Sequence, residues 1–378
     1  MSIDMKQILV TGGAGFIGTN LILKLLQMGY HITILDNLEA QVHGQAAKLN
    51  PALKPYVSFI KGDIKDYHAC EKALKNQNII IHLAADTATG QSMYEITKCT
   101  KSNIIGTANL LQCLSNQHMQ LEKFIFASSR AVYGEGKYIC PRCGIVYPKG
   151  RNIKDLKQRR YELYCPSCHG HIEKMPSDEE SILMPQSIYG ITKLTQEQYI
   201  RVICGALEIP YTILRFQNVY GEGQSLINPY TGILSIFSSR ILTGKPIHIF
   251  EDGLESRDFI HVQDVVSVIL SVLEQDVSEV VLNVGSGRST SLIELVKLLY
   301  RFYDMPVNYK INYKYRLGDI RHNCADINLI HEVLGFTPSI SLEEGLLRFT
   351  AWARKMNIFE DYYEESLNVM KGKGILKS

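Results

Sequence analysis

A tyrosine and a lysine lie four positions apart, as Tyr189 and Lys193, at the start of a stretch that predicts a helix over residues 188–206. Side chains at this spacing lie one above the other on the same helix face, so the phenol and the ammonium point the same way. A nearby ammonium favours the charged form of a phenol and lowers its pKa from about 10 toward the working range of a base. Because the pattern is common in long chains, the rest of the sequence decides whether it is catalytic.

A glycine-rich turn near the N-terminus has nearly the spacing of a dinucleotide-binding loop. Residues 11–18 read Thr-Gly-Gly-Ala-Gly-Phe-Ile-Gly and follow a predicted strand over residues 7–10. Such glycines let the backbone approach a pyrophosphate, and the next helix offers its unpaired N–H groups. The second predicted strand, residues 31–35, ends at Asp36, whose carboxylate suits the adenosine ribose and repels a 2′-phosphate. The pattern favours a site for NAD over a site for NADP. It also favours a cofactor-binding loop over a glycine turn that binds no ligand.

Further predicted strands over residues 57–64, 79–85 and 123–129 alternate with helices. This alternation predicts an α/β fold with a doubly wound parallel sheet. Ligands of such sheets bind outside the carboxyl ends of the strands, so these ends should surround the cofactor.

Four of the nine cysteines form two Cys-x-x-Cys pairs, Cys140 with Cys143 and Cys165 with Cys168. In a reducing compartment such pairs indicate metal before disulfide, and this doubled arrangement is typical of a Cys₄ zinc ribbon. Four thiolates close the coordination sphere, so we expect a structural zinc site. A redox Cys-x-x-Cys pair is the alternative, and the doubling argues against it.

Composition sets limits on the function. The chain has 378 residues, 46% hydrophobic and 21% charged, with a formal charge of +2. Its length suits two domains or one large α/β unit with a smaller lobe. We expect no nucleic acid and no membrane as partners, although basic residues lie between the cysteine pairs. The N-terminus leads straight into a strand, so we expect no signal peptide and a cytoplasmic protein.

Taken together, these motifs resemble those of the extended short-chain dehydrogenase/reductase family, whose members are largely nucleotide-sugar epimerases and dehydratases. The resemblance covers nearly the whole chain. The motifs that carry it are residues 11–18, Asp36, 82–85, 128–134, Tyr189 with Lys193, 214–221, 257–264, 283–287 and 316–319.

The resemblance implies roles for individual residues. Tyr189 would be the acid/base on a sugar hydroxyl, Ser129 would polarise the same oxygen, and Lys193 would bind the nicotinamide ribose and lower the pKa of Tyr189. The residues expected to contact NAD are Gly12, Gly15, Phe16, Ile17, Gly18, Asp36, Asn37, Asp63, Ile64, Leu83, Ala84, Ala85, Asn103, Tyr189 and Lys193. It also implies a homodimer formed through the helices near residues 98–116 and 188–206.

The resemblance further implies that a nucleotide-diphosphate sugar is the substrate. Its diphosphate would be clamped by Arg257 and Arg316, for which a solvated surface charge is the alternative. The residues expected to contact the substrate are Ser129, Arg130, Asn218, Asn228, Arg257 and Arg316. The predicted division is an NAD-binding domain over residues 1–134, completed by 182–220, a zinc-ribbon insertion over 135–181 and a nucleotide-sugar-binding lobe over 221–378. We expect the basic tail beyond Lys371 to fray.

Residues 129–131 limit which of the family's reactions we expect the protein to catalyse. Dehydratases of the family carry Thr-Asp-Glu where this chain has Ser129, Arg130 and Ala131, which argues against elimination of water. Residues 41–44, 90–96 and 228–232 and the cysteine insert resemble dTDP-L-rhamnose 4-epimerases, while Arg130 and Gln217 depart from the commoner family residues. We therefore expect a nucleotide-sugar 4-epimerase acting on dTDP-L-rhamnose or a related 6-deoxy or hexose nucleotide sugar, with tightly bound NAD. The alternatives are a nucleotide-sugar dehydrogenase or reductase, another epimerase of the family, or a non-catalytic nucleotide-sugar-binding protein.

Overall fold

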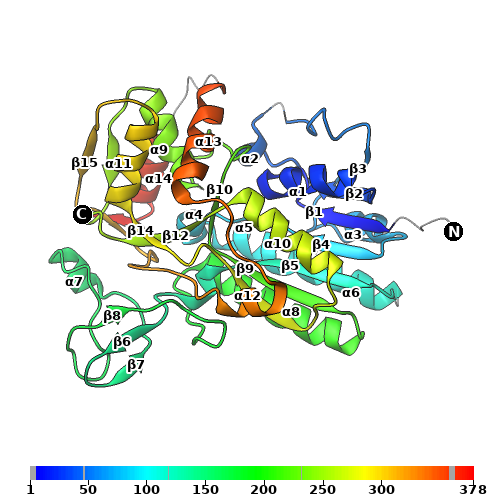
Figure 1. Ribbon diagram of the computed structural model, residues 1–378, viewed down its shortest axis with the longest axis horizontal. Coiled ribbons are helices and arrows are strands. Elements are labelled where there is room, and N and C mark those ends of the chain that lie inside the picture. The colour runs from blue at the N-terminus through cyan, green and yellow to red at the C-terminus, as the bar shows by residue number, and fades with distance from the viewer. Residues whose placement is uncertain (1–5, 46, 118, 231, 357–361) are drawn as a thin grey trace.

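A parallel sheet forms the centre of the computed structural model, which describes residues 6–45, 47–117, 119–230, 232–356 and 362–378 (Figure 1). Among these residues the sheet has seven strands in the order β13-β9-β5-β4-β1-β2-β3. Its strands are β1 (Gln7–Thr11), β2 (His31–Asp36), β3 (Val57–Lys61), β4 (Ile79–His82), β5 (Lys123–Ser129), β9 (Tyr211–Phe216) and β13 (Val280–Val284). Most of these strands are apolar along their length because both faces of the sheet are covered.

Helices cover the two faces and confirm the predicted doubly wound fold. One face carries α1 (Phe16–Gln27), α10 (Val262–Glu274) and α12 (Asn328–Leu334), and the other carries α3 (Tyr67–Leu74), α6 (Gly106–Gln117) and α8 (Ile188–Ala206). The chain runs from β1 outward through β2 and β3 and then returns to place β4 on the other side of β1. A crevice opens at such a switch point, outside the carboxyl ends of the strands.

The helix predicted near residues 98–116 is one helical run with a π-helical segment inside it. The run consists of α5 (Ile96–Thr100), the π segment η1 (Lys101–Ile105) and α6. Asn103 is fully buried within the π segment. π segments widen a helix locally and are frequent at functional sites.

The later part of the chain builds a second core beside the sheet, formed around residues such as Phe237, Leu295 and Phe349. Its helices are α9 (Ile233–Leu242), α11 (Leu292–Phe302) and α13 (Leu342–Arg354), and its strands are β10 (Asn218–Tyr220), β11 (Ile247–Ile249), β12 (Ser256–His261) and β15 (Tyr309–Ile311). Beside it, β14 (Ser289–Ser291) pairs with β12, and α14 (Tyr363–Gly372) packs in a smaller cluster with Leu376. The main sheet takes β13 from within residues 221–378. The division of the chain into domains stays a prediction.

The expectation of a frayed C-terminal tail is wrong. β17 (Leu376–Lys377) pairs antiparallel with β16 (Tyr315–Arg316), and Leu317 N donates to Ile375 O at 3.0 Å. The side chains of Ile375 and Leu376 are buried. Burial of these two apolar residues, which the neighbouring lysines obscure in the sequence, holds the tail in place.

The segment with the four cysteines projects from the main body, at the lower left of Figure 1. It contains β6 (Tyr138–Cys140), β7 (Gly144–Val146), α7 (Ile153–Lys157) and β8 (Glu173–Lys174), with a small core around Tyr138, Val146 and Leu163. A unit of this size buries too little apolar surface to be stable by itself, so a metal or contacts with the main body must support it.

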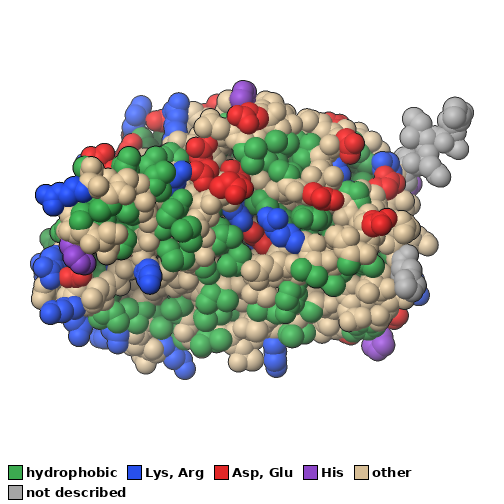
Figure 2. Space-filling model, turned by 90° about the horizontal axis from the view of Figure 1, so that it is seen from below, with side chains coloured by type: hydrophobic (Ala, Val, Ile, Leu, Met, Phe, Trp, Pro, Cys, Tyr) green, Lys and Arg blue, Asp and Glu red, His purple; other side chains and the backbone are tan. Residues whose placement is uncertain are grey.

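The space-filling view in Figure 2 shows charged side chains of both signs on one face of the molecule. On the face seen in Figure 2, lysine and arginine side chains are interspersed with acidic and apolar ones. In the part of the chain that the structure describes, no helix is both long and apolar enough to span a membrane.

Candidate active site and cysteine cluster

The glycine loop between β1 and α1 packs tightly against the chain that leaves β4. Gly12 has φ +69°, and a Cβ atom on it would lie 2.8 Å from the backbone nitrogen of Ala84. A Cβ atom on Gly18 would lie 2.6 Å from Gly12 O. Both positions therefore require glycine, and the loop can present its backbone N–H groups closely to a ligand.

Asp36, at the end of β2, is fixed by backbone donors. Its carboxylate accepts hydrogen bonds from Ala14 N at 3.0 Å and from Leu38 N at 2.8 Å. The side chain is buried at the edge of a cavity, beside Asn37 and Asp63. Asn37 Nδ2 donates to Asp63 Oδ2 at 3.0 Å, which orients both side chains. This places a fixed anion where a bound adenosine ribose would hydrogen-bond to it.

Replacing Asp36 by serine should weaken NAD binding and reduce the preference for NAD over NADP. We expect the NAD dissociation constant to rise about tenfold or more, because hydrogen bonds to a charged acceptor contribute about 1.5–3 kcal/mol. Titration of both cofactors by calorimetry measures the change, with the exposed Asp276→Ser as the control. An unchanged ratio of the two affinities would contradict the assignment.

A cavity of about 570 Å³ runs along the carboxyl edge of the sheet toward the second core. Most of the predicted site residues line it. They are Gly12, Gly15, Phe16, Ile17, Gly18, Asp36, Asn37, Asp63, Ile64, Leu83, Ala84, Ala85, Ser129, Arg130, Tyr189, Lys193, Asn218, Asn228, Arg257 and Arg316. The structure thus brings the predicted cofactor and substrate residues into one continuous space.

Asn103 lies behind the cavity wall. Its Nδ2 donates to Thr192 Oγ1 at 2.9 Å and to Asp86 O at 3.0 Å, and its Oδ1 accepts from Asp86 N at 2.8 Å. Asn103 therefore ties the segment after β4 to α8, the helix that carries Tyr189. A direct contact of Asn103 with a cofactor stays a prediction.

The first two turns of α8 place Tyr189 and Lys193 on the cavity. Ser187 caps the helix by accepting from Gly190 N at 3.1 Å, and Tyr189 N donates to Ser92 Oγ at 3.1 Å. Lys193 Nζ donates to Ala127 O at 2.8 Å, so the ammonium is tied to β5. The side chain of Ser129, at the end of β5, lies within hydrogen-bonding reach of the Tyr189 phenol.

The electrostatics of this cluster differ from the simple expectation for a Tyr–Lys pair. Burial raises the pKa of Tyr189 to about 12, and the Ser129 hydrogen bond and the charge of Arg130 offset only part of this rise. Burial also lowers the pKa of Lys193 to about 7. The helix spacing correctly placed both groups on the same cavity, whereas burial shifts the pKa of the phenol in the direction opposite to the expected one.

Three arginines line the far part of the cavity. Arg130 Nε donates to Asn218 Oδ1 at 3.0 Å, and burial beside Arg257 lowers the pKa of Arg130 to about 9. Arg316 Nε donates to Asp319 Oδ2 at 2.8 Å. Neighbouring carboxylates neutralise only part of the positive charge of these guanidinium groups. Such a cluster suits a ligand with several negative charges, such as a diphosphate. Asn228 is buried nearby, while Thr231 of the 228–232 motif lies outside the described residues.

A family model described as the NAD dependent epimerase/dehydratase family matches residues 8–147 and 157–285, more than half of the chain. The chain belongs to this family. The match confirms the resemblance predicted from the motifs, and its interruption between residues 147 and 157 falls inside the cysteine-bearing segment.

Members of the epimerase/dehydratase family resemble the chain over nearly its full length. This chain is 36% identical over 354 residues to a dTDP-L-rhamnose 4-epimerase of Burkholderia thailandensis, and the alignment covers 93% of this chain and 95% of that protein. It is 32% identical over 360 residues to a putative UDP-glucose 4-epimerase of Methanocaldococcus jannaschii, covering 93% and 99%.

Solved structures of epimerases also match the chain. The Thermotoga maritima UDP-glucose 4-epimerase with UDP-glucose gives a TM-score of 0.74 at 33% identity, covering 92% of this chain and 99% of that one. The Bacillus cereus UDP-glucuronic acid 4-epimerase in complex with UDP-glucuronic acid and NAD gives 0.76 at 25% identity, covering 93% and 99%.

Several carboxylates that line the cavity were not singled out from the sequence, and Asp86 is the one that follows a predicted cofactor residue directly. Asp86 lines the cavity directly after Ala85, and its burial raises its pKa while Lys98 opposes the rise. The signal available in the sequence was its position just beyond the carboxyl end of β4. A carboxylate there can accept a hydrogen bond from a ligand hydroxyl.

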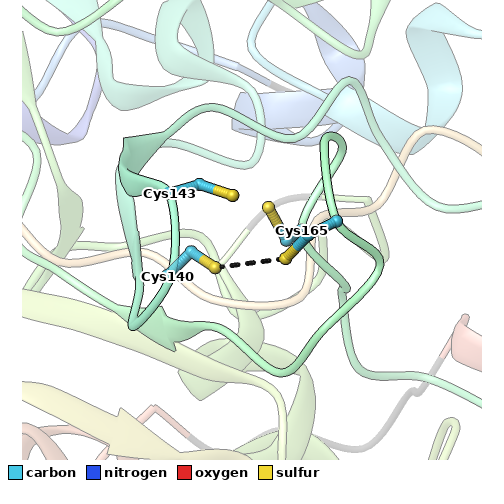
Figure 3. Close-up of side chains that lie close together, drawn as sticks. Cys140, Cys143 and Cys165 are labelled. Carbon is cyan, nitrogen blue, oxygen red and sulfur yellow. Dashed lines mark hydrogen bonds between the residues drawn. The ribbon is translucent and has the colours of Figure 1, made fainter.

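The four predicted metal ligands converge. The Sγ atoms of Cys140, Cys143, Cys165 and Cys168 all lie within 4.8 Å of one another, and Figure 3 shows the labelled side chains pointing toward a common centre. Four thiolates about 2.3 Å from a tetrahedral zinc ion lie about 3.8 Å apart, so the cluster needs only a small contraction.

The chemistry of the thiols also fits a cation. Backbone N–H groups of Cys168 and Ser167 lower the pKa of Cys165 to about 6, whereas contacts with the Cys168 and Cys165 sulfurs raise the pKa of Cys143 to about 12. Four thiolates this close repel one another unless a cation lies between them. The geometry and the donor set therefore both fit a structural zinc ion.

Proposed function

We propose that this protein is a nucleotide-sugar 4-epimerase that uses tightly bound NAD, with dTDP-L-rhamnose or a related 6-deoxy or hexose nucleotide sugar as substrate. The observation that carries the proposal is the shared cavity. It joins a glycine loop with Asp36, the Tyr189, Lys193 and Ser129 cluster, and the arginines at its far part. Membership of the family and the printed activities of the relatives support the same function.

In this proposal Tyr189 is the acid/base for the hydroxyl on carbon 4 of the sugar. Tyr189, as the phenolate, takes the hydroxyl proton and becomes the phenol, while Ser129 Oγ donates a hydrogen bond to the sugar oxygen that loses the proton. Loss of the proton and of a hydride from carbon 4 leaves a 4-keto sugar. Return of the hydride to the opposite face and of the proton from Tyr189 gives the epimer, so the overall reaction has no net oxidation.

The glycine loop and Asp36 would hold the adenosine diphosphate half of NAD, and Lys193 the nicotinamide ribose. The chemistry that bound NAD supplies is reversible hydride acceptance. Burial of the cluster excludes water, which strengthens the interactions within it and protects the keto intermediate.

The arginines favour a nucleotide diphosphate as the part of the substrate that is held most firmly. Arg257 and Arg316 would contact the diphosphate, and Asn218 and Asn228 would contact neighbouring groups. Arg130 follows Ser129 directly and faces the same cavity, so it would lie close to the sugar. In family dehydratases this position carries an acid, which argues against a 4,6-dehydratase.

The test is product analysis with purified protein. Incubation with dTDP-L-rhamnose, UDP-glucose and UDP-glucuronic acid, followed by NMR of the products, should reveal interconversion at carbon 4 of at least one sugar without added cofactor. Absence of any epimer would overturn the proposal. Stoichiometric release of NADH or NADPH would support a dehydrogenase or reductase instead, and binding without turnover a non-catalytic protein.

The cysteine cluster supports a second part of the proposal, a structural zinc ion held by Cys140, Cys143, Cys165 and Cys168. All four ligands are protein thiolates, so no position remains for substrate and the ion takes no part in the chemistry. Its role would be to hold the short strands β6, β7 and β8 together.

We also propose a homodimer formed through α8 and the run from α5 to α6. Exposed apolar side chains of Ile191, Tyr199 and Val202 recur along one face of α8, and Ile96 and Ile105 are exposed on the run packed beside it. Apolar patches of this kind mark interfaces. A cytoplasmic location, and the absence of nucleic acid and membrane partners, stay predictions.

Replacing Val202 by arginine should shift the protein from dimer to monomer, because a charge would be buried at the centre of the proposed interface. Light scattering after size exclusion measures the mass in solution. Leu347→Arg, at an exposed position of α13, should leave the dimer intact. A dimeric Val202→Arg protein would place the interface elsewhere.

A further inference from the structure

Arg257 takes its orientation from the backbone of another segment. Its Nη1 donates to Ser256 O at 2.8 Å and to Arg321 O at 3.0 Å, and its Nη2 donates to Ile320 O at 2.7 Å. These bonds fix the plane of the guanidinium group. The segment that supplies two of the three carbonyl groups also carries Arg316 at its start. Residues 316–321, here called the arginine-holding segment, therefore set the position of both predicted diphosphate contacts.

The arginine-holding segment is anchored at its end by Arg321, whose side chain is fully buried and does not line the cavity. Its Nη1 and Nη2 donate to Asp252 at 2.7 and 2.9 Å, and its Nε donates to Glu162 Oε1 at 2.8 Å. Glu162 belongs to the cysteine-bearing insert, three residues before Cys165. Removal of a carboxylate partner leaves the charge of a buried guanidinium group less well compensated and destabilises its position, even though Glu251 also accepts from Arg321 Nη1 at 3.2 Å.

A second residue of the insert hydrogen-bonds to the arginine-holding segment. Arg151, almost completely buried, donates through Nη1 to Glu251 Oε2 at 2.6 Å and through Nη2 to Asp319 O at 2.8 Å. Tyr161 adds a hydrogen bond from its hydroxyl to Tyr313 O at 3.1 Å. Neither Arg151 nor Glu162 lines the cavity. The insert thus holds the backbone that orients Arg257 without reaching the ligand itself.

We propose that Arg151 and Glu162 are positioning residues, through which the cysteine-bearing insert fixes the arginines that bind the nucleotide diphosphate. This inference rests on the proposed function, in which Arg257 contacts the diphosphate. The insert acts on one half of the site because its contacts with Glu251, Asp319 and Arg321 lie on the substrate side. The glycine loop and Asp36, at the cofactor side, have their own support in β1 and β2.

The experiment measures the binding of UDP and of dTDP separately from NAD content and from turnover. Glu162→Ala should raise the dissociation constant of the diphosphate about tenfold, an effect of about 1.4 kcal/mol. KM for the sugar nucleotide should rise with it, while kcat and the NAD content per chain stay within about twofold, because the Tyr189 cluster is untouched. Glu162→Gln, which keeps one acceptor for Arg321, should restore most of the affinity.

Two controls separate positioning from simple destabilisation. Asp155→Ala removes an exposed ion pair with Arg160 inside the same insert and should change neither affinity nor KM. In a double-mutant cycle, Glu162→Ala should have a clearly smaller effect in an Arg257→Leu background than in the wild-type protein, since part of its action passes through Arg257. Full additivity in the cycle, unchanged diphosphate binding, or a joint loss of NAD and diphosphate would each overturn the inference.

The same measurements distinguish a failure of this inference from a failure of the proposed function. If UDP or dTDP binds in a way that depends on Arg257 and Glu162 but no sugar is epimerised, the epimerase proposal fails and the inference stands. If the wild-type protein binds neither diphosphate, the inference fails whatever the protein catalyses.

Discussion

The Tyr189→Phe protein should lose about 10²–10⁴-fold in kcat for epimerisation, the range expected when a general acid/base is removed. The phenyl ring keeps the packing of Tyr189 but has no oxygen to take the proton of the carbon-4 hydroxyl. Since the phenol is not needed to hold the adenosine half of NAD, the cofactor content should stay nearly unchanged. Turnover followed by NMR, together with cofactor content after denaturation, measures both quantities.

A matched control lies on the same helix. Tyr199 is also on α8, but its side chain is exposed and lies outside the cavity lining, so Tyr199→Phe should leave kcat within about twofold. Full activity of the Tyr189→Phe protein would contradict the acid/base role of Tyr189 and would favour the alternative of a non-catalytic binding protein. A selective loss at Tyr189 would connect the Tyr-x-x-x-Lys pattern to the reaction itself.

Metal removal should have the second largest effect. Purified protein should contain about one zinc ion per chain, and Cys143→Ser should lose most of it, because a structural site needs all four thiolates. The insert should then open locally, seen as faster amide hydrogen exchange in β6, β7 and β8. Through Arg151 and Glu162 the binding of UDP should weaken as well, while NAD remains bound.

The comparison variant is Cys324→Ser, which removes a thiol outside the cluster. It should keep the zinc content and the exchange rates of the insert. A Cys143→Ser protein with unchanged zinc content, or a metal-free wild-type protein whose insert is fully protected from exchange, would contradict the assignment. Spectra of a cobalt-substituted protein would report the tetrahedral thiolate coordination independently of activity.

The sequence by itself determined the features that depend on local spacing. The glycine loop needs glycine where Gly12 and Gly18 meet the backbone, and a strand, turn and helix in register place that loop at the carboxyl edge of the sheet. Helical periodicity put Tyr189 and Lys193 on one face, and α8 spans the predicted residues 188–206. Each Cys-x-x-Cys spacing brings the two sulfurs of its own pair together in a short turn, and the doubled pattern predicted the cluster that the folded insert forms.

Tertiary structure alone decided what depends on contacts between distant segments. Burial, which no spacing reports, raises the pKa of Tyr189 where a neighbouring lysine predicted the opposite. Asn103 hydrogen-bonds to Asp86 O and Thr192 Oγ1, which joins the segment after β4 to α8. Docking of the insert on Arg321 joins residues about 160 positions apart. Such pairings follow from the packing of the whole chain, because charged and apolar groups that lie far apart in sequence find their partners only when the core has formed.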